Sequence, residues 1–423
     1  MKVGTIDFFN SIYTTFMDSE IFLLNISGQD KPGLTSSLTA VLAEYDAKIL
    51  DIGQANIHNT LSLGILFQIK SGKKSAAVLK DLLFKSYELG IKAKFTPISL
   101  DDYENWVGLQ GKDRYIVTLL GDKLTAEHIS QVTRVISEKN LNIDAIKRLT
   151  GRASLIKEND YPRACIQLSI RGAIIDKSEF TSKFMQISRE LNLDIAFQED
   201  NIYRRNRRLV CFDMDSTLIQ TEVIDELAEL AGVGEQVKAI TESAMQGEID
   251  FQESFKQRML LLKGLSEEVL ENVAINLPIT KGARRLIDTL KSYGFKTAIL
   301  SGGFTYFGKY LQKELGIDYV YANELEIKDG LLTGGYIGEI VDGNKKAEYL
   351  KEIALREGIH INQTIAVGDG ANDLPMLNLA GLGIAFHAKP KVKDNAQSSI
   401  SSIGLDGVLY LLGYHDRHID LVN

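Results

Sequence analysis

Two aspartates one residue apart, Asp213 and Asp215, follow the apolar run at residues 209–212. Such a run is typical of a strand buried on both faces, as in a parallel sheet. Chain that leaves the carboxyl end of such a strand enters the crevice in which open α/β sheets hold their ligands. Two carboxylates there could share a divalent cation, and Asp213 could act as a nucleophile. The alternative is a turn rich in Asp, Ser and Thr.

A second apolar run, residues 297–300, leads into Ser301, Gly302 and Gly303. Glycines let backbone N–H groups approach an anion closely, and the serine hydroxyl adds another donor. This segment therefore predicts a phosphate-binding loop at the end of a second strand.

A third apolar run, residues 364–367, is followed by Asp369 and, four residues later, Asp373. These acids could face one point if a helical turn follows the strand. Between the second and third motifs, Asn344 is a candidate cap for a helix that carries Lys345 and Lys346 in its first turn. Cations there oppose the helix dipole, which an anionic partner would explain, although a lone lysine is more often a solvated surface residue.

Taken in this order, the motifs at residues 208–423 resemble phosphatases of the haloacid dehalogenase (HAD) superfamily and, within it, the phosphoserine phosphatase family. The closer resemblance rests on Glu222 and on the segment 245–258. It implies an α/β fold, a HAD-like Rossmannoid parallel sheet, with a helical cap inserted after the first motif at about residues 221–282.

The resemblance also implies an activity, the Mg²⁺-dependent hydrolysis of O-phospho-L-serine to L-serine and phosphate. Asp213 would form an aspartyl-phosphate, and Asp215 would act as general acid and then as general base. Mg²⁺ would be held by the carboxylates of Asp213 and Asp369 and the backbone carbonyl of Asp215, with Asp373 in support. The residues expected to bind the substrate are Glu222, Met245, Phe251, Arg258, Ser301, Gly302, Lys346 and Asn372. We choose Lys346 over Lys345 because its spacing to the following helix matches the family.

The spacing of side chains in the cap agrees with this interpretation. Phe251, Phe255 and Arg258 fall at positions i, i+4 and i+7, and so on one face of a predicted helix. A guanidinium on that face can clamp a carboxylate through two parallel hydrogen bonds, and Glu222 can complement an ammonium group. The alternatives are an arginine stem that covers the core and an ordinary acid in the first turn of a helix.

The first half of the chain carries an internal repeat of the order βαββαβ. The first copy has predicted strands at 20–27, 47–57, 62–69 and 93–98 and predicted helices at 34–45 and 74–89. The second copy has predicted strands at 114–121, 142–149, 164–171 and 194–199 and predicted helices at 125–140 and 177–192. We predict domains at 18–99, 113–200 and 208–423.

The two repeats resemble ACT domains, ferredoxin-like modules that commonly bind amino acids in enzymes of amino-acid metabolism. The turn Asp30-Lys31-Pro32-Gly33-Leu34 carries the resemblance in the first copy, whereas the second copy lacks the Pro-Gly pair. Two roles stay open, amino-acid sensing, with L-serine as the natural effector, and dimerisation alone. We expect a homodimer.

The composition is that of an ordinary globular protein, with 44% hydrophobic and 25% charged residues. A net charge of −8 gives no general attraction to nucleic acid or to anionic lipid, so neither is an expected partner. The basic segment 204–208 is an exception, which we interpret as a solvated hinge between the regulatory and catalytic halves. Two isolated cysteines and the lack of a signal pattern favour a cytoplasmic protein without disulfides.

Two other functions remain as alternatives. A HAD phosphatase for another small phosphomonoester would make no use of Arg258. An amino-acid-sensing binding protein with a silent phosphatase domain would have no reason to keep every acid of the three motifs.

Overall fold

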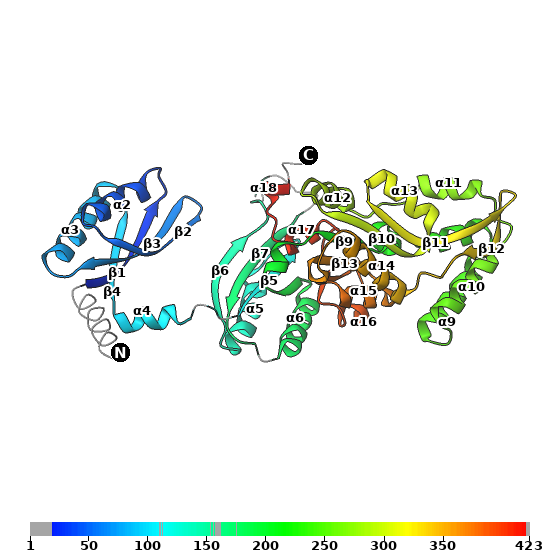
Figure 1. Cartoon of the computed structure of the whole chain (residues 1–423), viewed down its shortest axis with the longest axis horizontal. Coiled ribbons are helices and arrows are strands. Elements are labelled where there is room, and N and C mark those ends of the chain that lie inside the picture. Colours follow the sequence, from blue (N-terminus) through cyan, green and yellow to red (C-terminus); the bar gives the residue numbers. More distant parts are fainter. Residues whose placement is uncertain are drawn as a thin grey trace, which may run out of the picture. The chain divides into compact units, whose positions relative to one another are not determined.

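A computed structural model describes residues 19–109, 111, 113–152, 154, 156, 162–174 and 176–419, without the side chain of Met245. Two ends of the predicted domains, residue 18 and residues 420–423, lie outside this part. The chain divides into two compact units, Met1–Gly111 and Lys112–Asn423. Each unit is described by itself, and Figure 1 labels the elements.

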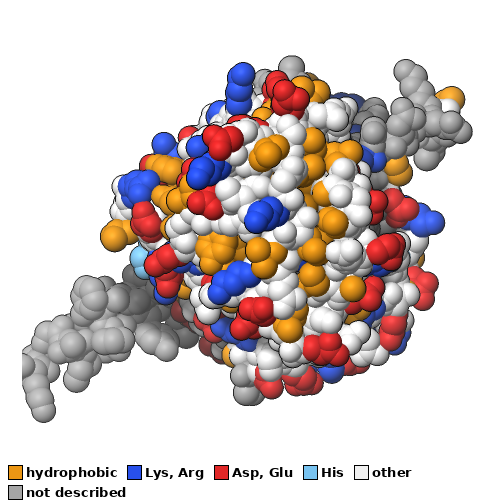
Figure 2. All heavy atoms as spheres, turned by 90° about the vertical axis from the view of Figure 1, so that its right-hand side faces the viewer, with side chains coloured by type: hydrophobic (Ala, Val, Ile, Leu, Met, Phe, Trp, Pro, Cys, Tyr) orange, Lys and Arg blue, Asp and Glu red, His pale blue; other side chains and the backbone are white. Residues whose placement is uncertain are grey.

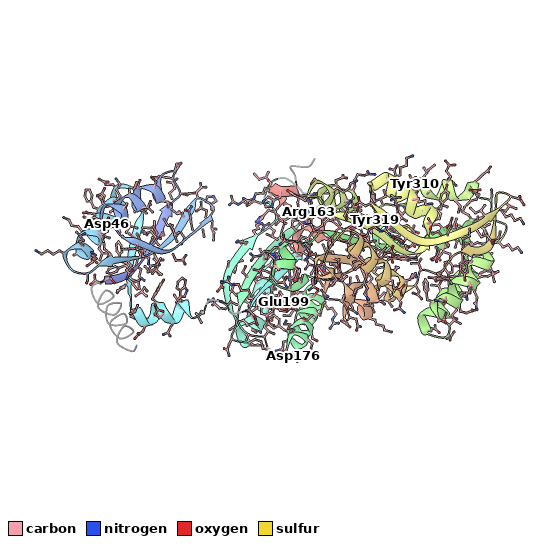
Figure 3. All side chains as sticks on the ribbon, in the orientation of Figure 1. Asp46, Arg163, Asp176, Glu199, Tyr310 and Tyr319 are labelled. Carbon is pink, nitrogen blue, oxygen red and sulfur yellow. The ribbon has the colours of Figure 1, made fainter. Side chains whose placement is uncertain are left out.

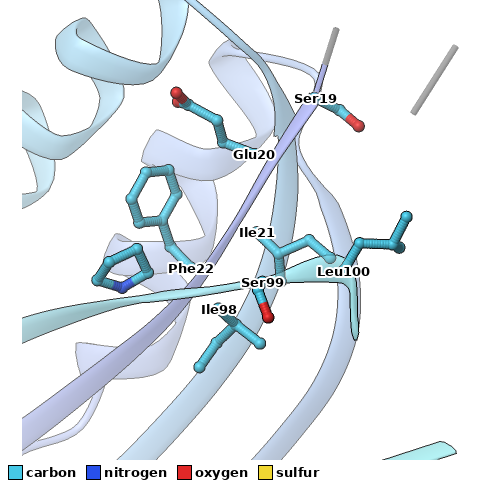
Figure 4. Close-up of a pocket in the computed structure, with 8 residues that line it drawn as sticks. Ser19, Glu20, Ile21, Phe22, Ile98, Ser99 and Leu100 are labelled. Atoms are coloured by element: carbon cyan, nitrogen blue, oxygen red, sulfur yellow. The ribbon is translucent and has the colours of Figure 1, made fainter. Parts of the chain in front are cut away.

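The first unit contains the first repeat. Its described strands form an antiparallel sheet in the order β2-β3-β1-β4, and both helices of the repeat bury their apolar residues against it. The elements are β1 (Ser19–Gln29), α2 (Leu34–Glu44), β2 (Lys48–Ile57), β3 (Thr60–Lys70), α3 (Lys73–Glu88) and β4 (Lys92–Ile98), followed by α4 (Leu100–Val107). The predicted order βαββαβ is confirmed. A hollow of about 430 Å³ lies where β1 begins and β4 ends (Figure 4).

The second unit begins with the second repeat, whose described strands have the equivalent order β6-β7-β5-β8. The elements are β5 (Arg114–Gly121), α5 (Ala126–Glu138), β6 (Asn142–Arg148), β7 (Ala164–Arg171), α6 (Lys177–Leu191) and β8 (Asp194–Glu199). Here too the predicted order is confirmed.

The rest of the second unit is built on a larger sheet with the order β12-β11-β10-β9-β13-β14-β15 among the described strands. Neighbours from β11 to β15 are parallel, and β12 pairs antiparallel with β11. The strands are β9 (Leu209–Phe212), β10 (Lys296–Phe304), β11 (Tyr319–Lys328), β12 (Leu331–Ile337), β13 (Thr364–Gly368), β14 (Leu382–Phe386) and β15 (Ser398–Ile400). The predicted parallel α/β sheet is confirmed.

Helices surround this sheet, and two apolar clusters fill the layers between helices and sheet. Four helices are inserted after β9, where the cap is predicted: α8 (Val223–Leu230), α9 (Gly234–Gln246), α10 (Phe251–Leu261) and α11 (Glu268–Ile275). The other helices are α7 (Ile202–Arg205), η1 (Met214–Leu218), α12 (Ala283–Ser292), α13 (Thr305–Leu315), α14 (Gly343–Arg356), η2 (Ile361–Gln363), η3 (Ala371–Asp373), α15 (Leu374–Leu379), α16 (Pro390–Lys393), α17 (Gly407–Leu411) and α18 (Asp416–Ile419). Among the described helices, none combines the length and apolar character needed to cross a membrane.

Two local predictions are wrong. The basic segment is not a solvated hinge, because Arg207 is buried and donates hydrogen bonds to Gln198 of β8 and to the Thr364 carbonyl of β13. These bonds hold Arg207 between the second repeat and the large sheet. The cap of α14 is Asp342, not Asn344, and its carboxylate accepts a hydrogen bond from the Lys345 N–H. Asp, like Asn, satisfies the free N–H groups of a first helical turn.

The surface of the second unit is mixed in character. On the face shown in Figure 2, acidic, basic and hydrophobic side chains are interspersed. Among the described residues, Cys165 and Cys211 are buried and free.

Candidate active site

The central strands of the large sheet bring the three sequence motifs together. β9 lies between β10 and β13 and pairs parallel with both. Asp213 follows β9, Ser301 lies in the last part of β10, and Asp369 follows β13. The Asp213 N–H donates to the Val367 carbonyl at 2.8 Å, which fixes the first motif against the third. Parallel strands end at one edge of a sheet, so all three motifs meet there, as the sequence predicts.

Three carboxylates form a compact cluster at this edge. Each of Asp213, Asp369 and Asp373 offers one oxygen, and these oxygens lie within 4.8 Å of one another. Asp213 is 5% exposed and Asp373 is fully buried. Burial, and next the charge of Asp373, raises the pKa of Asp213 well above its ordinary value. Burial and the same neighbour raise the pKa of Asp369 to about 7. A site with this much crowded negative charge fits a divalent cation, which prefers carboxylate oxygens.

Lys346 of α14 compensates part of this charge. Its Nζ lies 2.8 Å from Asp213 Oδ1 and 2.6 Å from Asp373 Oδ1, and the side chain is fully buried. Burial alone lowers the pKa of the Lys346 ammonium, but Asp213 and Asp373 raise it above its ordinary value. The neighbouring Lys345 instead pairs with Glu339 and Glu348 near the surface. Of the two lysines, the structure therefore brings Lys346 into the site.

Asp215 is held apart from the three clustered carboxylates. Its Oδ1 accepts a hydrogen bond of 2.9 Å from the Val223 N–H at the start of α8, and its Oδ2 lies 3.5 Å from Ser301 Oγ. Burial, and next the charge of Glu222, raises the pKa of Asp215 to about 8. A raised pKa favours the protonated form of a carboxyl group, which is the form that can donate a proton.

The two glycines after Ser301 permit close approach. A Cβ atom at Gly303 would collide with Asp215 Oδ2, and one at Gly302 would lie 2.9 Å from Cζ of Phe251. Ser301 Oγ accepts a hydrogen bond of 2.8 Å from the Gly303 N–H, which closes the loop on itself. The predicted anion loop therefore lies directly beside the acids and beneath the cap residue Phe251.

The cap brings further predicted residues toward this edge. Glu222 precedes α8, and its Oε1 accepts a hydrogen bond of 2.7 Å from Ser216 Oγ. Arg258 of α10 is half-buried, and its Nε donates to the Ser254 carbonyl at 3.4 Å. Burial lowers the pKa of Arg258, and the charges of Glu222, Asp225 and Asp215 oppose this. Among the described residues, no carboxylate forms an ion pair with Arg258, so its outer nitrogens are available to an anion.

For two of the predicted site residues, the described structure gives the position in the chain but no side-chain contact with the acids. Met245 lies on α9, and its side chain is outside the described part of the structure. Asn372 lies in η3, between the loop that carries Asp369 and the buried Asp373, where its backbone carbonyl closely approaches Gly343 at the start of α14.

Two positioning residues were not predicted from the sequence. Asn323 of β11 is 1% exposed, donates to the Gly302 carbonyl at 2.8 Å and accepts from the Val341 N–H at 2.8 Å. Thr217 Oγ1 donates to Asp369 Oδ1 at 3.1 Å. Thr217 stood inside the first motif and could have been singled out. Asn323 gave no signal, because its strand was not predicted.

Comparison with known proteins defines the class to which this site belongs. The model of haloacid dehalogenase-like hydrolases matches residues 210–378, and models of ACT domains match residues 20–96 and 114–198. The second half of the chain is thus a HAD-like hydrolase domain preceded by two ACT domains.

Relatives that match over more than nine-tenths of the chain define its family more closely. A phosphoserine phosphatase of Mycobacterium tuberculosis is 37% identical over 92% of this chain and 92% of its own length. One of Streptomyces coelicolor is 38% identical over 95% of this chain and 94% of its own. The crystal structure of a probable phosphoserine phosphatase from Vibrio cholerae covers 74% of this chain and 89% of its own, with 36% identity and a TM-score of 0.56. The chain belongs to the phosphoserine phosphatase family and is an enzyme.

Proposed function

We propose that the protein hydrolyses O-phospho-L-serine to L-serine and phosphate with Mg²⁺, through a phosphorylated Asp213. The observation that carries the proposal is the buried arrangement of Asp213, Lys346 and Asp373 beside the Ser301 loop, with a second carboxyl group, Asp215, held apart. The names of the relatives support the choice of substrate.

In the first step, Asp213 attacks phosphorus and the serine oxygen leaves. A carboxylate nucleophile needs no base, but it must be ionised. Burial and the charge of Asp373 raise the pKa of Asp213 and oppose this, whereas Lys346 at 2.8 Å, and the cation when bound, would favour the charged form. Asp215, whose pKa is raised to about 8, gives its proton to the departing serine oxygen. In the second step, the ionised Asp215 takes a proton from the water that attacks the aspartyl-phosphate, which returns both carboxyl groups to their starting states.

Three side chains and one carbonyl suit a divalent cation. The carboxylates of Asp213, Asp369 and Asp373 and the backbone carbonyl of Asp215 would hold Mg²⁺, with Asp373 in support because Lys346 already occupies one of its oxygens. When bound, the cation offsets the repulsion between the carboxylates and the phosphate oxygens. The Ser301 hydroxyl, the Gly302 N–H and Lys346 would bind the phosphoryl group as its charge spreads.

The cap residues would select the amino-acid part of the substrate. Arg258, which lacks an ion pair among the described residues, would bind the carboxylate, and Glu222 would bind the ammonium group. Phe251, against Gly302, and Met245 would line the pocket, and Asn372 would complete it. This arrangement distinguishes phosphoserine from esters that lack a carboxylate.

The direct test is phosphate release from O-phospho-L-serine with Mg²⁺. We expect Asp213→Asn to lower turnover by on the order of 10³ or more, because it removes the nucleophile. Asp288→Asn, on the exposed side of α12, is the matched control and keeps full activity. Wild-type turnover in Asp213→Asn would contradict the mechanism.

Arg258→Ala tests the substrate. We expect kcat/KM for phosphoserine to fall by roughly 10- to 100-fold, since a charged hydrogen bond is lost, and kcat/KM for phosphoethanolamine to stay unchanged. An equal loss for both esters would assign Arg258 to the cap structure, not to carboxylate recognition, and would favour another phosphomonoester as substrate.

We also propose that the first ACT domain binds an amino acid, with L-serine as the effector. Gly33, with φ of 89°, turns the chain into α2 beside Asp30, which accepts a hydrogen bond of 2.5 Å from Asn56 Nδ2. A cytoplasmic homodimer built through ACT domains belongs to the same proposal, and size-exclusion chromatography with light scattering tests it.

A further inference from the structure

A cluster of arginines lies far from the acids, at the opposite end of the strands that carry them. Arg207 donates to the carbonyl of Thr364, the first residue of β13, whereas Asp369 follows the last residue of that strand. Residues 204–208, which link the second ACT domain to the hydrolase domain, form one wall of a hollow of about 240 Å³, and the other lining residues belong to the hydrolase domain. The hollow is lined by Arg204, Arg205, Asn206, Arg207, Arg208, Tyr293, Phe295, Leu412 and Tyr414.

No acidic side chain is among the described residues that line this hollow. Arg207 is 6% exposed, and its two hydrogen bonds go to uncharged acceptors, Gln198 Oε1 at 3.1 Å and the Thr364 carbonyl at 3.3 Å. Its Nε is buried and has no partner in the described structure. Burial, and next the charge of Arg204, lowers the pKa of Arg207 to about 9. The positive charge of Arg207 is thus buried without a counter-charge.

Arg204 is also buried, with donors that are unpartnered in the described structure. Its side chain is 8% exposed, and its Nε and Nη2 are buried without a partner among the described residues. The nearest acid is Asp200, with Oδ1 3.9 Å from Arg204 Nη1. Asp200 is already held by two hydrogen bonds, of 2.7 and 3.2 Å, from Arg205. The Asp200 carboxylate therefore compensates the charge of the exposed Arg205 more than that of the buried Arg204.

Two of the free donors, on Arg204 and Gln167, lie near Gly413, which stands between the lining residues Leu412 and Tyr414. A Cβ atom there would lie 3.5 Å from Arg204 Nη2 and 3.8 Å from Nε2 of Gln167, a residue of β7. Gln167 Nε2 is also buried without a partner in the described structure. Gly413 has a φ of 87°, which favours glycine, so position 413 contributes no side chain to the space near these donors.

We propose that this hollow is a second anion site, in which Arg204 and Arg207 bind a small oxyanion, either inorganic phosphate or a carboxylate, with the Gln167 amide adjoining Arg204. Planar guanidinium groups match both anions through paired hydrogen bonds. A buried charge without a partner destabilises the folded state, and a bound anion removes that cost. The site joins β7, the segment after α7 and β13, so its occupant stabilises the junction between the two domains.

The test is thermal unfolding of the full chain at constant ionic strength, with potassium chloride, phosphate or acetate. We expect phosphate or acetate to raise the unfolding temperature of the wild type above its value in chloride. The active site also binds phosphate, but it is the same in every variant, so its contribution cancels in the comparison. A larger shift with phosphate assigns a phosphate-type ligand, and a larger shift with acetate assigns a carboxylate.

Arg204→Gln removes a guanidinium group and the paired hydrogen bonds that it can donate. We expect this variant to raise the apparent Kd for the anion, obtained from the shift of the unfolding temperature, by about tenfold or more. Arg189→Gln is the matched control, since Arg189 forms an exposed ion pair with Asp394 at the same junction and does not line the hollow. If Arg204→Gln fails to fold, Arg204→Lys replaces it in the test. Lysine keeps the charge but cannot donate paired hydrogen bonds, so we expect this variant to retain only part of the anion-dependent rise in the unfolding temperature. The proposal is overturned if neither anion acts differently from chloride, or if the Arg204 variants respond as the wild type does.

Discussion

The two ACT domains have the same order of elements, yet the sheet face away from their helices differs. In the first domain this face carries exposed polar side chains, among them Asn25 on β1 and Lys92 and Lys94 on β4. In the second domain the same face is buried, with Thr118 on β5 and Asp194 and Ala196 on β8 exposed by 3% or less.

The strand registers make the comparison residue by residue. Ser27 pairs with Lys92 in the first domain, and Leu120 pairs with Asp194 in the second, each near the end of the equivalent strand pair. Two residues further along β4 and β8, on the same face of the sheet, Lys94 corresponds to Ala196. A change from lysine to aspartate or alanine at these positions accompanies the change from an exposed face to a buried one.

What covers the second domain is the hydrolase domain itself. Leu120, Leu149, Cys165 and Ala196 belong to the apolar cluster that fills the hydrolase core. Asp194 accepts hydrogen bonds from the Ser401 and Ser402 N–H groups at 2.8 and 2.9 Å. Arg163, which is labelled in Figure 3, forms an ion pair with Asp406. The same fold thus serves as a separate unit in one copy and as a continuation of the catalytic core in the other.

Ala196→Lys places at the buried position the lysine that the first domain carries. We expect it to lower the free energy of unfolding of the second unit by on the order of 3 kcal/mol or more, because an unpaired charge is buried. Lys94→Ala is the reciprocal control and changes the free energy of unfolding by less than about 0.5 kcal/mol. Calorimetry of the full chain checks both, and equal effects would end the distinction between the two faces.

Asp194→Asn tests the polar part of the junction. Ser402 Oγ also donates to Asp194 at 2.6 Å, so the carboxylate receives three hydrogen bonds. An amide cannot accept all three, and we expect a loss of about 1–3 kcal/mol in the free energy of unfolding. Lys92→Gln, at the equivalent exposed position, serves as control. A free energy of unfolding unchanged by Asp194→Asn would show that these bonds contribute nothing net.

Asp30→Ala asks whether the exposed domain is the one that binds an amino acid. We expect L-serine to change the fluorescence of Trp106, which lies on α4 of the same unit, and expect the change to be lost in Asp30→Ala. Asp122→Ala, in the corresponding turn of the second domain, keeps the response. Loss of the response in Asp122→Ala alone would reverse the assignment.

The smallest expected effect is on pH dependence at the junction. Burial, and next the charge of Arg417, lowers the pKa of His415 below 6.5 in the folded state, and Lys147 of the second domain acts in the same direction. The unfolded chain therefore takes up a proton first as the pH falls below about 6.5, and folding stability decreases there. We expect His415→Asn to flatten this part of the stability profile and His58→Asn, in the exposed turn between β2 and β3 of the first unit, to preserve it. An unchanged slope in His415→Asn would remove His415 as the cause.

Much of the fold could be predicted from the sequence, since both repeats have strong periodicity and clear turn residues. Predicted and observed strands agree within about two residues at most ends, as for 114–121 and β5. The hairpin of β11 and β12 was missed because its residues alternate weakly and carry no motif. The hinge prediction failed because five polar residues in a row, 204–208, suggest solvent, whereas Arg207 is buried and hydrogen-bonded to β8 and β13, and the Arg204 side chain is only 8% exposed.

Residue types and their order along the chain were enough to predict the available chemistry: which strands end in acids, which loop can receive an anion, and that two ACT-like units precede them. These properties are local. Long-range packing was needed to bring Lys346 to Asp373 across 27 residues and Thr217 to Asp369 across 152, and to cover one ACT sheet while the other is exposed. Burial and contact depend on which distant segments pack together, and no local pattern contains that information.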